Sequence, residues 1–391
     1  MDPRRNPFAP GAGTRPPELA GRDEVIERAS IALDRIRAGR AARSFIFYGL
    51  RGVGKTVLLS RIMGDAEANG FATVMLEAPE GRSLPSQLAP HLRALFLRLN
   101  RTGKAKDMFE RSLKALAGFV SAVKVKYQDV EVGIDAAPEK GLADSGDLEL
   151  DLRDLVQTAG EAAKQAGTAI VIFIDELQYF EENELAALIT AIHHANQNQL
   201  PITVIGAGLP PLLGQLGRAK SYAERLFEFV PIGALSLLAV QEALRKPIEA
   251  ESAVIDEEAI SQIYLDTEGY PYFLQEWGKH AWNAASGNTI TGDVVALVGS
   301  DIFAELDASF FRVRFDRLTP VEKDYLHAMA QLGDGDHRSG EIAAQLHRPV
   351  SAVSPIRNSL IKKGMIYSPA HGDTAFTVPM FGGFLMRTLP P

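Results

Sequence analysis

The chain has 391 residues, with 41 Lys and Arg against 49 Asp and Glu, which gives a formal net charge of −8. At about 150 residues per domain this length predicts two or three domains, and the negative charge excludes a polycation built to coat nucleic acid. The absence of cysteine excludes disulfide scaffolds, thiolate metal sites and cysteine nucleophiles. No apolar run approaches the roughly 20 residues that span a bilayer, so we expect a cytoplasmic globular protein.

Changes in composition divide the chain into four predicted segments. Residues 1–20 hold five prolines, a composition that favours an extended arm. Residues 21–235 alternate between strand-like and helix-like patterns, and residues 82–166 within them form an insert. Residues 236–318 are helical in pattern and are predicted to be a lid and linker, whereas residues 319–391 form a last small domain.

Five short apolar runs in the second segment are predicted strands. Helical patterns separate these runs, and strands that alternate with helices indicate a parallel sheet. The predicted fold class is therefore α/β. The spacing of the runs leaves the order of the strands open. The predicted strands are 44–48, 72–76, 169–174, 202–205 and 227–232.

The insert separates the second and third predicted strands by about ninety residues, which is too long for a bare loop. Helical periodicity is present in residues 84–99 and 106–123, and a helix at 147–165 leads into the third strand. Residues 122–134 alternate as a hairpin does. After the last strand, the helical patterns continue. The predicted helices there are 238–249, 256–265, 272–285 and a run near 301–311.

A glycine-rich loop follows the first predicted strand. Residues 49–56, Gly-Leu-Arg-Gly-Val-Gly-Lys-Thr, satisfy G-x-x-x-x-G-K-[ST] at every constrained position. The glycines allow backbone N–H groups to approach phosphate oxygens, and the helix that follows offers its positive end to the same anion. In such a loop Lys55 reaches the β and γ phosphates and the Thr56 hydroxyl ligates Mg²⁺. The predicted nucleotide-binding residues are Gly49, Leu50, Arg51, Gly52, Val53, Gly54, Lys55, Thr56 and Val57.

The third predicted strand ends in two carboxylates. Because residues 170–174 are all large and apolar, this strand is buried on both faces. Asp175 at its end is placed to hold a Mg²⁺ ion, and Glu176 could accept a proton from the attacking water. An acidic pair that caps the next helix is the alternative. Gln178 would orient that water or signal the nucleotide state, or it is an ordinary surface glutamine.

The last segment has the element order of a winged helix-turn-helix. Thr319-Pro320-Val321-Glu322 opens a helix with a capping box. Two shorter helices follow at 340–346 and 350–363, and residues 365–378 alternate around a turn as a hairpin or wing does. The solvent-facing side chains of the third helix are of types that contact phosphates or base edges. They are Ser351, Ser354, Arg357 and Lys362.

These features together resemble a known family. The phosphate loop, the strand ending in Asp175-Glu176, the opening Gly21-Arg22-Asp23-Glu24 and the C-terminal module look like AAA+ ATPases of the origin-recognition-complex type. Residues 175–178 (DELQ) and 269–275 (GYPYFLQ) are similar to the prokaryotic archaeal-type ATPases, relatives of the STAND signalling switches.

The resemblance implies a P-loop sheet of the ASCE type, in which one strand separates the phosphate-loop strand from the Asp175 strand, then a helical lid and a winged helix. It implies ATP or ADP with Mg²⁺ as ligands and puts Arg22 beside the adenine. The best match to the family's arginine finger is Arg225, with Arg218 second. A finger from one subunit stabilises the charge on a neighbour's γ phosphate, whereas a surface salt bridge is the alternative for Arg225.

The sequence departs from this family at two positions. Residues 202–208 end in glycines where the family's sensor strand carries Asn, Thr or Ser, and residues 269–272 lack the arginine that usually opens a lid helix. We therefore expect hydrolysis to be slow or to depend on a partner.

Three functions are compatible with the sequence. The preferred one is an ATP-binding, slowly hydrolysing switch that acts on double-stranded DNA through the winged helix. The alternative is a STAND-like signalling or defence ATPase whose partner is a protein. The third is a nucleotide-binding module without hydrolysis. The preference for ATP over GTP rests on the resemblance alone.

Overall fold

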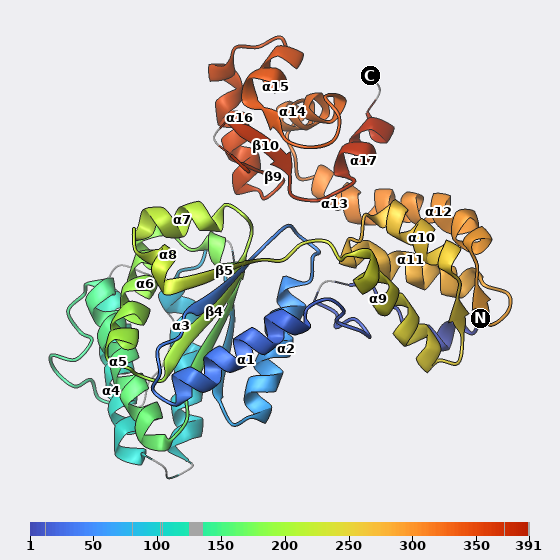
Figure 1. Ribbon diagram of the computed structural model, residues 1–391. Coiled ribbons are helices and arrows are strands. Elements are labelled where there is room, and N and C mark those ends of the chain that lie inside the picture. Colours follow the sequence, from blue (N-terminus) through green and yellow to red (C-terminus); the bar gives the residue numbers. More distant parts are fainter. Residues whose placement is uncertain are drawn as a thin grey trace. The chain divides into compact units, whose positions relative to one another are not determined.

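Figure 1 shows the computed structural model of the chain, which describes residues 1–11, 13–79, 81–101, 103, 105–124, 136–370 and 372–389. The chain forms two compact units. The sheet unit comprises residues 22–49 and 55–232. The helical unit comprises residues 1–21, 50–54 and 233–391.

The sheet unit contains a five-stranded parallel sheet with the strand order β2-β3-β4-β1-β5. β4 lies between β1 and β3, which confirms that one strand separates the phosphate-loop strand from the strand that ends in Asp175. Gly206 on β4 is in register with Ile46 on β1 and with Ile174 on β3. The carboxyl ends of these three strands therefore meet at one edge of the sheet. The strands are β1 (Ser44–Tyr48), β2 (Ala72–Glu77), β3 (Ile170–Asp175), β4 (Ile202–Gly208) and β5 (Phe227–Pro231).

Helices cover both faces of this sheet. Every residue of β3 and β4 is buried, as is typical of parallel strands in α/β proteins. Within the described residues no helix of either unit is both long and apolar enough to cross a membrane. The helices of this unit outside the insert are α1 (Asp23–Arg37), α2 (Lys55–Ala68), η2 (Leu177–Tyr179), α6 (Glu182–Gln197), α7 (Leu212–Ala219) and α8 (Ala223–Leu226).

The insert adds three helices, α3 (Leu84–Asn100), α4 (Lys106–Val123) and α5 (Leu148–Ala166), which confirms the helices predicted there. Their apolar faces belong to the same hydrophobic core as the inner residues of the sheet. The predicted hairpin at 122–134 lies almost wholly outside the described residues, and its first two residues end α4.

The lid part of the helical unit is a bundle of helices, as predicted. The predicted start of one helix is wrong: the run expected near residues 301–311 begins at Gly292, and its added turns bury the apolar side chains Val295 and Val298. A two-residue parallel pair, β6 (Val254–Ile255) with β7 (Thr289–Ile290), was too short to predict. The helices are α9 (Leu237–Ala250), α10 (Glu257–Thr267), α11 (Pro271–Ala284), α12 (Gly292–Leu306), the π-helical η3 (Asp307–Phe311) and α13 (Arg312–Phe315).

The N-terminal arm packs on α11 of the same unit. The prediction of a wholly extended arm is wrong at η1 (Pro3–Arg5), a short 3-10 turn that proline can begin. The Phe8 side chain is buried against Gly278, where a Cβ atom would lie 2.7 Å from the ring. The Trp282 indole donates a hydrogen bond to the Asp2 carbonyl over 2.9 Å. The arm is therefore part of the bundle.

The C-terminal part has the predicted three helices and hairpin, and in addition a third strand and a last helix. The antiparallel sheet has the order β8-β10-β9. The prediction that Arg357 faces solvent from the third helix needs correction. Its guanidinium donates hydrogen bonds to the Thr374 hydroxyl over 2.9 Å and to the Asp373 carbonyl over 2.8 Å, so Arg357 holds the hairpin on α16. The elements are α14 (Pro320–Gln331), β8 (His337–Arg338), α15 (Ser339–Gln345), α16 (Val350–Lys362), β9 (Ile366–Tyr367), β10 (Asp373–Phe376) and α17 (Phe381–Thr388).

Candidate nucleotide-binding site

The phosphate loop connects the end of β1 to the first residue of α2, Lys55. Gly52 and Gly54 have φ values of +84° and +90°, which only glycine adopts without strain. The Lys55 side chain is buried, and its Nζ donates a hydrogen bond to the Gly49 carbonyl over 2.9 Å. The loop therefore has the backbone conformation that the glycine pattern predicts, with the lysine folded over it.

Thr56 and Asp175 meet at the carboxyl edge of the sheet. The Thr56 hydroxyl donates a hydrogen bond to Asp175 Oδ2, although the two residues are far apart in the chain. Asp175 is only 3% exposed. A hydroxyl and a carboxylate side by side are oxygen donors of the kind that Mg²⁺ binds. These residues therefore fit the magnesium ion that the sequence predicts.

Burial raises the pKa of the Asp175 carboxyl, and the negative charge of Glu176 acts in the same direction. The hydrogen bond from Thr56 and the positive charge of Lys55 oppose this rise in pKa. A divalent cation beside Asp175 would favour the ionised carboxylate in the same way as Lys55 does.

Glu176 has a left-handed backbone with φ of 55°, a conformation that is uncommon for a residue other than glycine. Its N–H donates to Asp175 Oδ1 over 2.9 Å. Its carboxylate accepts a hydrogen bond from the Gln178 side-chain amide. The side-chain oxygen of Gln178 in turn accepts from the N–H of Leu209, just beyond β4, over 3.0 Å. Gln178 therefore connects the candidate general base to the end of the neighbouring strand.

The glycines at the end of β4 are explained by this arrangement. A Cβ atom on Gly208 would lie 2.6 Å from the Gln178 side-chain oxygen and 2.7 Å from Leu212. A Cβ atom on Gly206 would overlap the side chain of Leu177. The polar group at this strand end comes from Gln178, where the resembling family carries a polar residue on the strand itself.

Within the helical unit, the apex of the phosphate loop contacts the lid. The Gly52 carbonyl accepts a hydrogen bond from the Tyr272 N–H at the start of α11 over 3.3 Å. A Cβ atom on Gly52 would lie 3.0 Å from the Tyr270 ring. Burial raises the pKa of Tyr270, whereas the charges of Arg314 and Arg51 lower it. The segment 269–272, which the sequence marked for its family resemblance and for its lack of arginine, therefore packs on the loop.

The C-terminal part of the same unit also contacts the loop apex. The Arg51 N–H donates to the Thr377 carbonyl over 3.3 Å. A Cβ atom on Gly364, whose φ is +64°, would lie 2.8 Å from the Arg51 guanidinium. Arg314 stacks on Phe310 with its guanidinium carbon 4.0 Å from the ring centroid. Burial and the charge of Arg51 lower the pKa of Arg314.

The remaining predicted site residues are arginines of the sheet unit. Arg22, which precedes α1, is half-buried, and burial lowers its pKa. Arg225 on α8 is exposed, and no ion pair joins it to a described residue. Arg218 on α7 forms an exposed ion pair with Glu182 over 3.4 Å. Arg225 is thus more accessible to a second molecule than Arg218, and the roles of all three arginines stay predictions.

Comparison with family models identifies two regions. Residues 18–205 match the AAA ATPase domain. Residues 308–385 match DUF8462, a domain of unknown function. No curated protein is similar enough to match the chain.

One solved structure shares the fold of the chain. The Walker-type ATPase of Pyrococcus abyssi is 16% identical, with 95% of this chain and 97% of that chain covered and a TM-score of 0.56. Weaker likenesses, with TM-scores of 0.47 and 0.46, are the Aeropyrum pernix ORC1 protein (15% identity, 95% and 93% covered) and a Thermotoga maritima RuvB mutant (14% identity, 95% and 97% covered). The fold, the loop geometry and the family match agree, so residues 18–205 form an AAA ATPase domain.

Proposed function

We propose that this protein is a molecular switch that binds ATP with Mg²⁺ and hydrolyses it slowly. One observation carries the proposal: Lys55 and Thr56 begin α2 directly after the phosphate loop, and the Thr56 hydroxyl is hydrogen-bonded to Asp175 at the end of β3. In a P-loop enzyme these three residue types contact the β and γ phosphates and the metal ion.

Each residue has a distinct task in this proposal. Backbone N–H groups of the loop and the Lys55 ammonium bind the phosphates, and Thr56 and Asp175 would hold the metal ion. Mg²⁺ supplies positive charge that neutralises the phosphate oxygens during transfer. Glu176 accepts a proton from the attacking water as a general base. Gln178 fixes the direction of the Glu176 carboxylate through their hydrogen bond.

We expect slow hydrolysis because this chain lacks two groups that the resembling family carries, the polar residue of the sensor strand and the lid arginine. The end of β4 carries glycines, and segment 269–272 has no arginine. Charge that develops on the γ phosphate is therefore stabilised by Lys55 and the metal, and an arginine from a second molecule would add to this. A slow intrinsic rate that a partner accelerates is what a switch requires.

Calorimetry with ATP and Mg²⁺ tests the binding step. We expect saturable binding in the wild type and a loss of at least about tenfold in Lys55→Ala, equivalent to ~1.4 kcal/mol. Lys164→Ala, which removes an exposed lysine from α5, is the matched control and should bind like the wild type. No binding heat for ATP or GTP would end the proposal.

Glu176→Gln tests the hydrolytic step. This variant should bind ATP normally and hydrolyse it about 10² to 10⁴ times more slowly, because general-base catalysis is worth that much. A variant that turns over at the wild-type rate would exclude Glu176 as the base. Hydrolysis that is undetectable in the wild type as well, with every partner offered, would leave a binding module.

We propose DNA as the partner of the C-terminal module, with the module used as a winged helix. Residues 319–391 carry seven Lys and Arg against six Asp and Glu, so this module is slightly basic in a chain of charge −8. Ser351 and Lys362 on α16 are exposed, and so is Arg348 just before it. Side chains of these types bind phosphates and base edges.

Fluorescence anisotropy with a labelled duplex, with and without ATP and across a salt series, tests this proposal. The double variant Arg348→Gln with Lys362→Gln should bind more weakly, and each lost phosphate contact should reduce the salt slope by about 1. Lys106→Gln with Arg61→Gln removes the same charge from the sheet unit and is the control. Absence of duplex binding at low salt in both nucleotide states would exclude DNA.

A protein partner is the second candidate, and two observations favour it. Arg357, the central cation of α16, is hydrogen-bonded to the hairpin, which leaves it fewer donors for a duplex. Val350 and Met386 of the same module are 47% and 45% exposed, and a protein partner would cover these apolar side chains. Nucleotide that stays bound through purification, together with a turnover that DNA does not change, would favour this candidate.

A further inference from the structure

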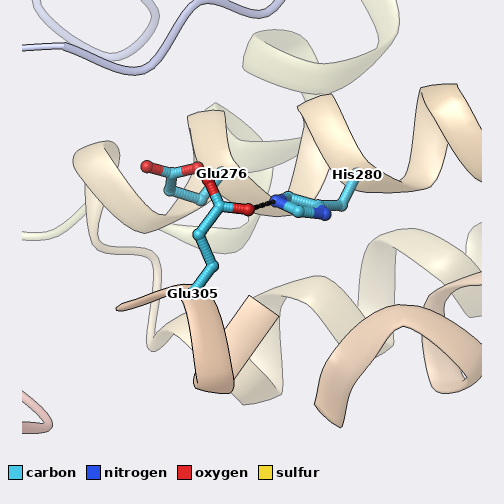
Figure 2. Close-up of side chains that lie close together, drawn as sticks. All are labelled: Glu276, His280 and Glu305. Carbon is cyan, nitrogen blue, oxygen red and sulfur yellow. Dashed lines mark ion pairs between the residues drawn. The ribbon is translucent and has the colours of Figure 1, made fainter. Parts of the chain in front are cut away.

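Three side chains with metal-binding atoms gather between two helices of the lid, away from the phosphate loop in the sequence. Glu276 and His280 lie four residues apart on α11, a spacing that puts both on one face of the helix. Glu305 comes from the last turn of α12. One ligand atom from each residue lies within 4.8 Å of those of the other two, and Figure 2 shows the three side chains converging.

One carboxylate oxygen of Glu276 accepts a hydrogen bond, whereas the other has none within the described residues. It is only 7% exposed. Its Oε1 accepts a hydrogen bond from the Tyr272 hydroxyl over 3.0 Å. Its Oε2 is buried and has no hydrogen-bond partner among the described residues. A buried carboxylate oxygen without a hydrogen bond is costly, so such an atom indicates a missing partner.

The imidazole of His280 has the same property. Its Nε2 lies 3.0 Å from Glu305 Oε2, but within the described part of the chain this nitrogen is buried and makes no contact with the geometry of a hydrogen bond. Two buried atoms that can each donate an electron pair therefore face the same small space, next to a carboxylate oxygen of Glu305.

Lys279 supplies the positive charge that is already close to the cluster. Its ammonium donates to Glu305 Oε1 over 3.1 Å, and it lies 3.6 Å from Glu276 Oε2 without a hydrogen bond. An ion-pair network centred on Lys279 therefore gives Glu305 a hydrogen bond but leaves Glu276 Oε2 and His280 Nε2 without hydrogen bonds within the described residues. A cation placed between the three ligand atoms would satisfy all of them.

We propose that Glu276, His280 and Glu305 form a three-ligand site for a divalent transition-metal cation of the Zn²⁺ class. One imidazole nitrogen with two carboxylate oxygens suits zinc, cobalt or manganese, whereas magnesium and calcium prefer oxygen ligands alone. The Tyr272 hydroxyl is the outer hydrogen bond that orients a ligating carboxylate. The Lys279 side chain, 31% exposed and flexible, swings into solvent when the metal binds. The bound cation ties α11 to the end of α12.

Titration of metal-free full-length protein with Co²⁺, followed by its visible absorption without nucleotide, tests the site. We expect one saturable site per chain, from which Zn²⁺ displaces Co²⁺. His280→Gln and Glu305→Gln should each weaken binding at least tenfold while circular dichroism shows an unchanged fold. Zn²⁺ should raise the melting temperature of the wild type and not that of His280→Gln.

Two control variants separate this site from other histidines and from the phosphate loop. His194→Gln and Asp175→Asn should bind Co²⁺ as the wild type does. Lys279→Gln removes the competing ammonium and should bind Co²⁺ more tightly. The proposal is overturned if no saturable binding occurs, if His280→Gln and Glu305→Gln bind like the wild type, or if Lys279→Gln binds more weakly.

Discussion

At the scale of single residues, the hydrolytic part of the site depends on Glu176 and Gln178. Glu176 has a left-handed backbone, and residues held in sparsely populated conformations cluster at functional sites. Its carboxylate direction is set by the amide of Gln178, whose oxygen is fixed by the Leu209 N–H. A general base must be held within hydrogen-bond reach of its water. Gln178 is therefore a positioning residue in the proposed mechanism.

We predict that Gln178→Ala lowers kcat about tenfold, or ~1.4 kcal/mol of transition-state stabilisation, while the Kd for ATP changes little. The physical reason is that the variant frees the Glu176 carboxylate without touching the phosphate loop. Steady-state ATPase kinetics and calorimetry give the two quantities. Gln165→Ala, on the exposed face of α5, should change neither, and equal losses of binding and turnover in Gln178→Ala would contradict a positioning role.

At the scale of elements, the carboxyl end of β4 is packed too closely for a side chain. Gly208 has an ordinary φ, so glycine is required there by space and not by backbone angle. We predict that Gly208→Ala destabilises the protein by about 1–3 kcal/mol, the usual cost of overpacking a core, and lowers turnover because it displaces Gln178. Urea unfolding and ATPase assays measure both effects.

The substitution Gly217→Ala on α7 is the matched control for Gly208→Ala. No atom would lie within 4 Å of a Cβ atom there. Because alanine favours a helix over glycine by roughly 0.5–1 kcal/mol, Gly217→Ala should be neutral or stabilising. A Gly208→Ala protein as stable as Gly217→Ala would show that the strand end can accept a side chain.

The buried carboxylate of Glu322 on α14 holds α14 against the end of α16. Burial of Glu322 raises its pKa, but hydrogen bonds from Lys363, Thr319 and Ser359 outweigh that effect and lower the pKa to about 2. A carboxyl whose folded pKa is below its ordinary value of 4.5 stabilises the fold above pH 4.5. That contribution is lost as the pH falls from 4.5 towards 2.

We therefore predict that Glu322→Gln lowers the free energy of unfolding at pH 7 by about 1–3 kcal/mol. The difference between this variant and the wild type should shrink as the pH falls below 4.5, because the wild-type carboxylate is then protonated on unfolding. Urea unfolding at several pH values measures it. Asp324→Asn, on the exposed side of α14, is the control, and a difference independent of pH would contradict the account.

At the scale of the whole molecule, the chain passes between its two units inside the phosphate loop. Residue 49 belongs to the sheet unit, residues 50–54 to the helical unit and residue 55 again to the sheet unit. In the helical unit the loop apex is bonded to the lid through Gly52 and to the C-terminal part through Arg51. If nucleotide binding reshapes the loop, both parts of the helical unit are affected directly.

Substitution of Arg225 tests whether one chain completes the ATPase site of another chain. If this exposed arginine completes a neighbour's site, ATPase activity per chain should rise with protein concentration and Arg225→Ala should lower it by a factor on the order of a thousand at saturation. A mixture of Arg225→Ala with Glu176→Gln should regain activity, because each variant supplies what the other lacks. Arg218→Ala is the control, and activity that is independent of concentration in the wild type would exclude a trans-acting arginine.

Local sequence patterns alone were enough to predict many of the structural elements of this protein. The phosphate loop, the strand that ends in Asp175 and most helices could be predicted because glycine content, apolar runs and helical periodicity are properties of neighbouring residues. Family resemblance predicted that one strand lies between the phosphate-loop strand and the Asp175 strand, whereas the places of β2 and β5 at the edges came from the tertiary structure. Short elements such as β6 and β7 gave no signal, since two residues do not establish a period.

Only the tertiary structure decided what distant residues do together. The sequence leaves open whether Gln178 belongs to the site or is an ordinary surface residue, and the fold puts it between Glu176 and Leu209. Arg357 is predicted from the sequence to face solvent, but in the fold it holds the hairpin. Glu276, His280 and Glu305 form no recognisable motif, because α11 and α12 meet through packing. The sequence determines which chemistry each residue can perform, whereas the packing of separate elements determines which residues come within bonding distance.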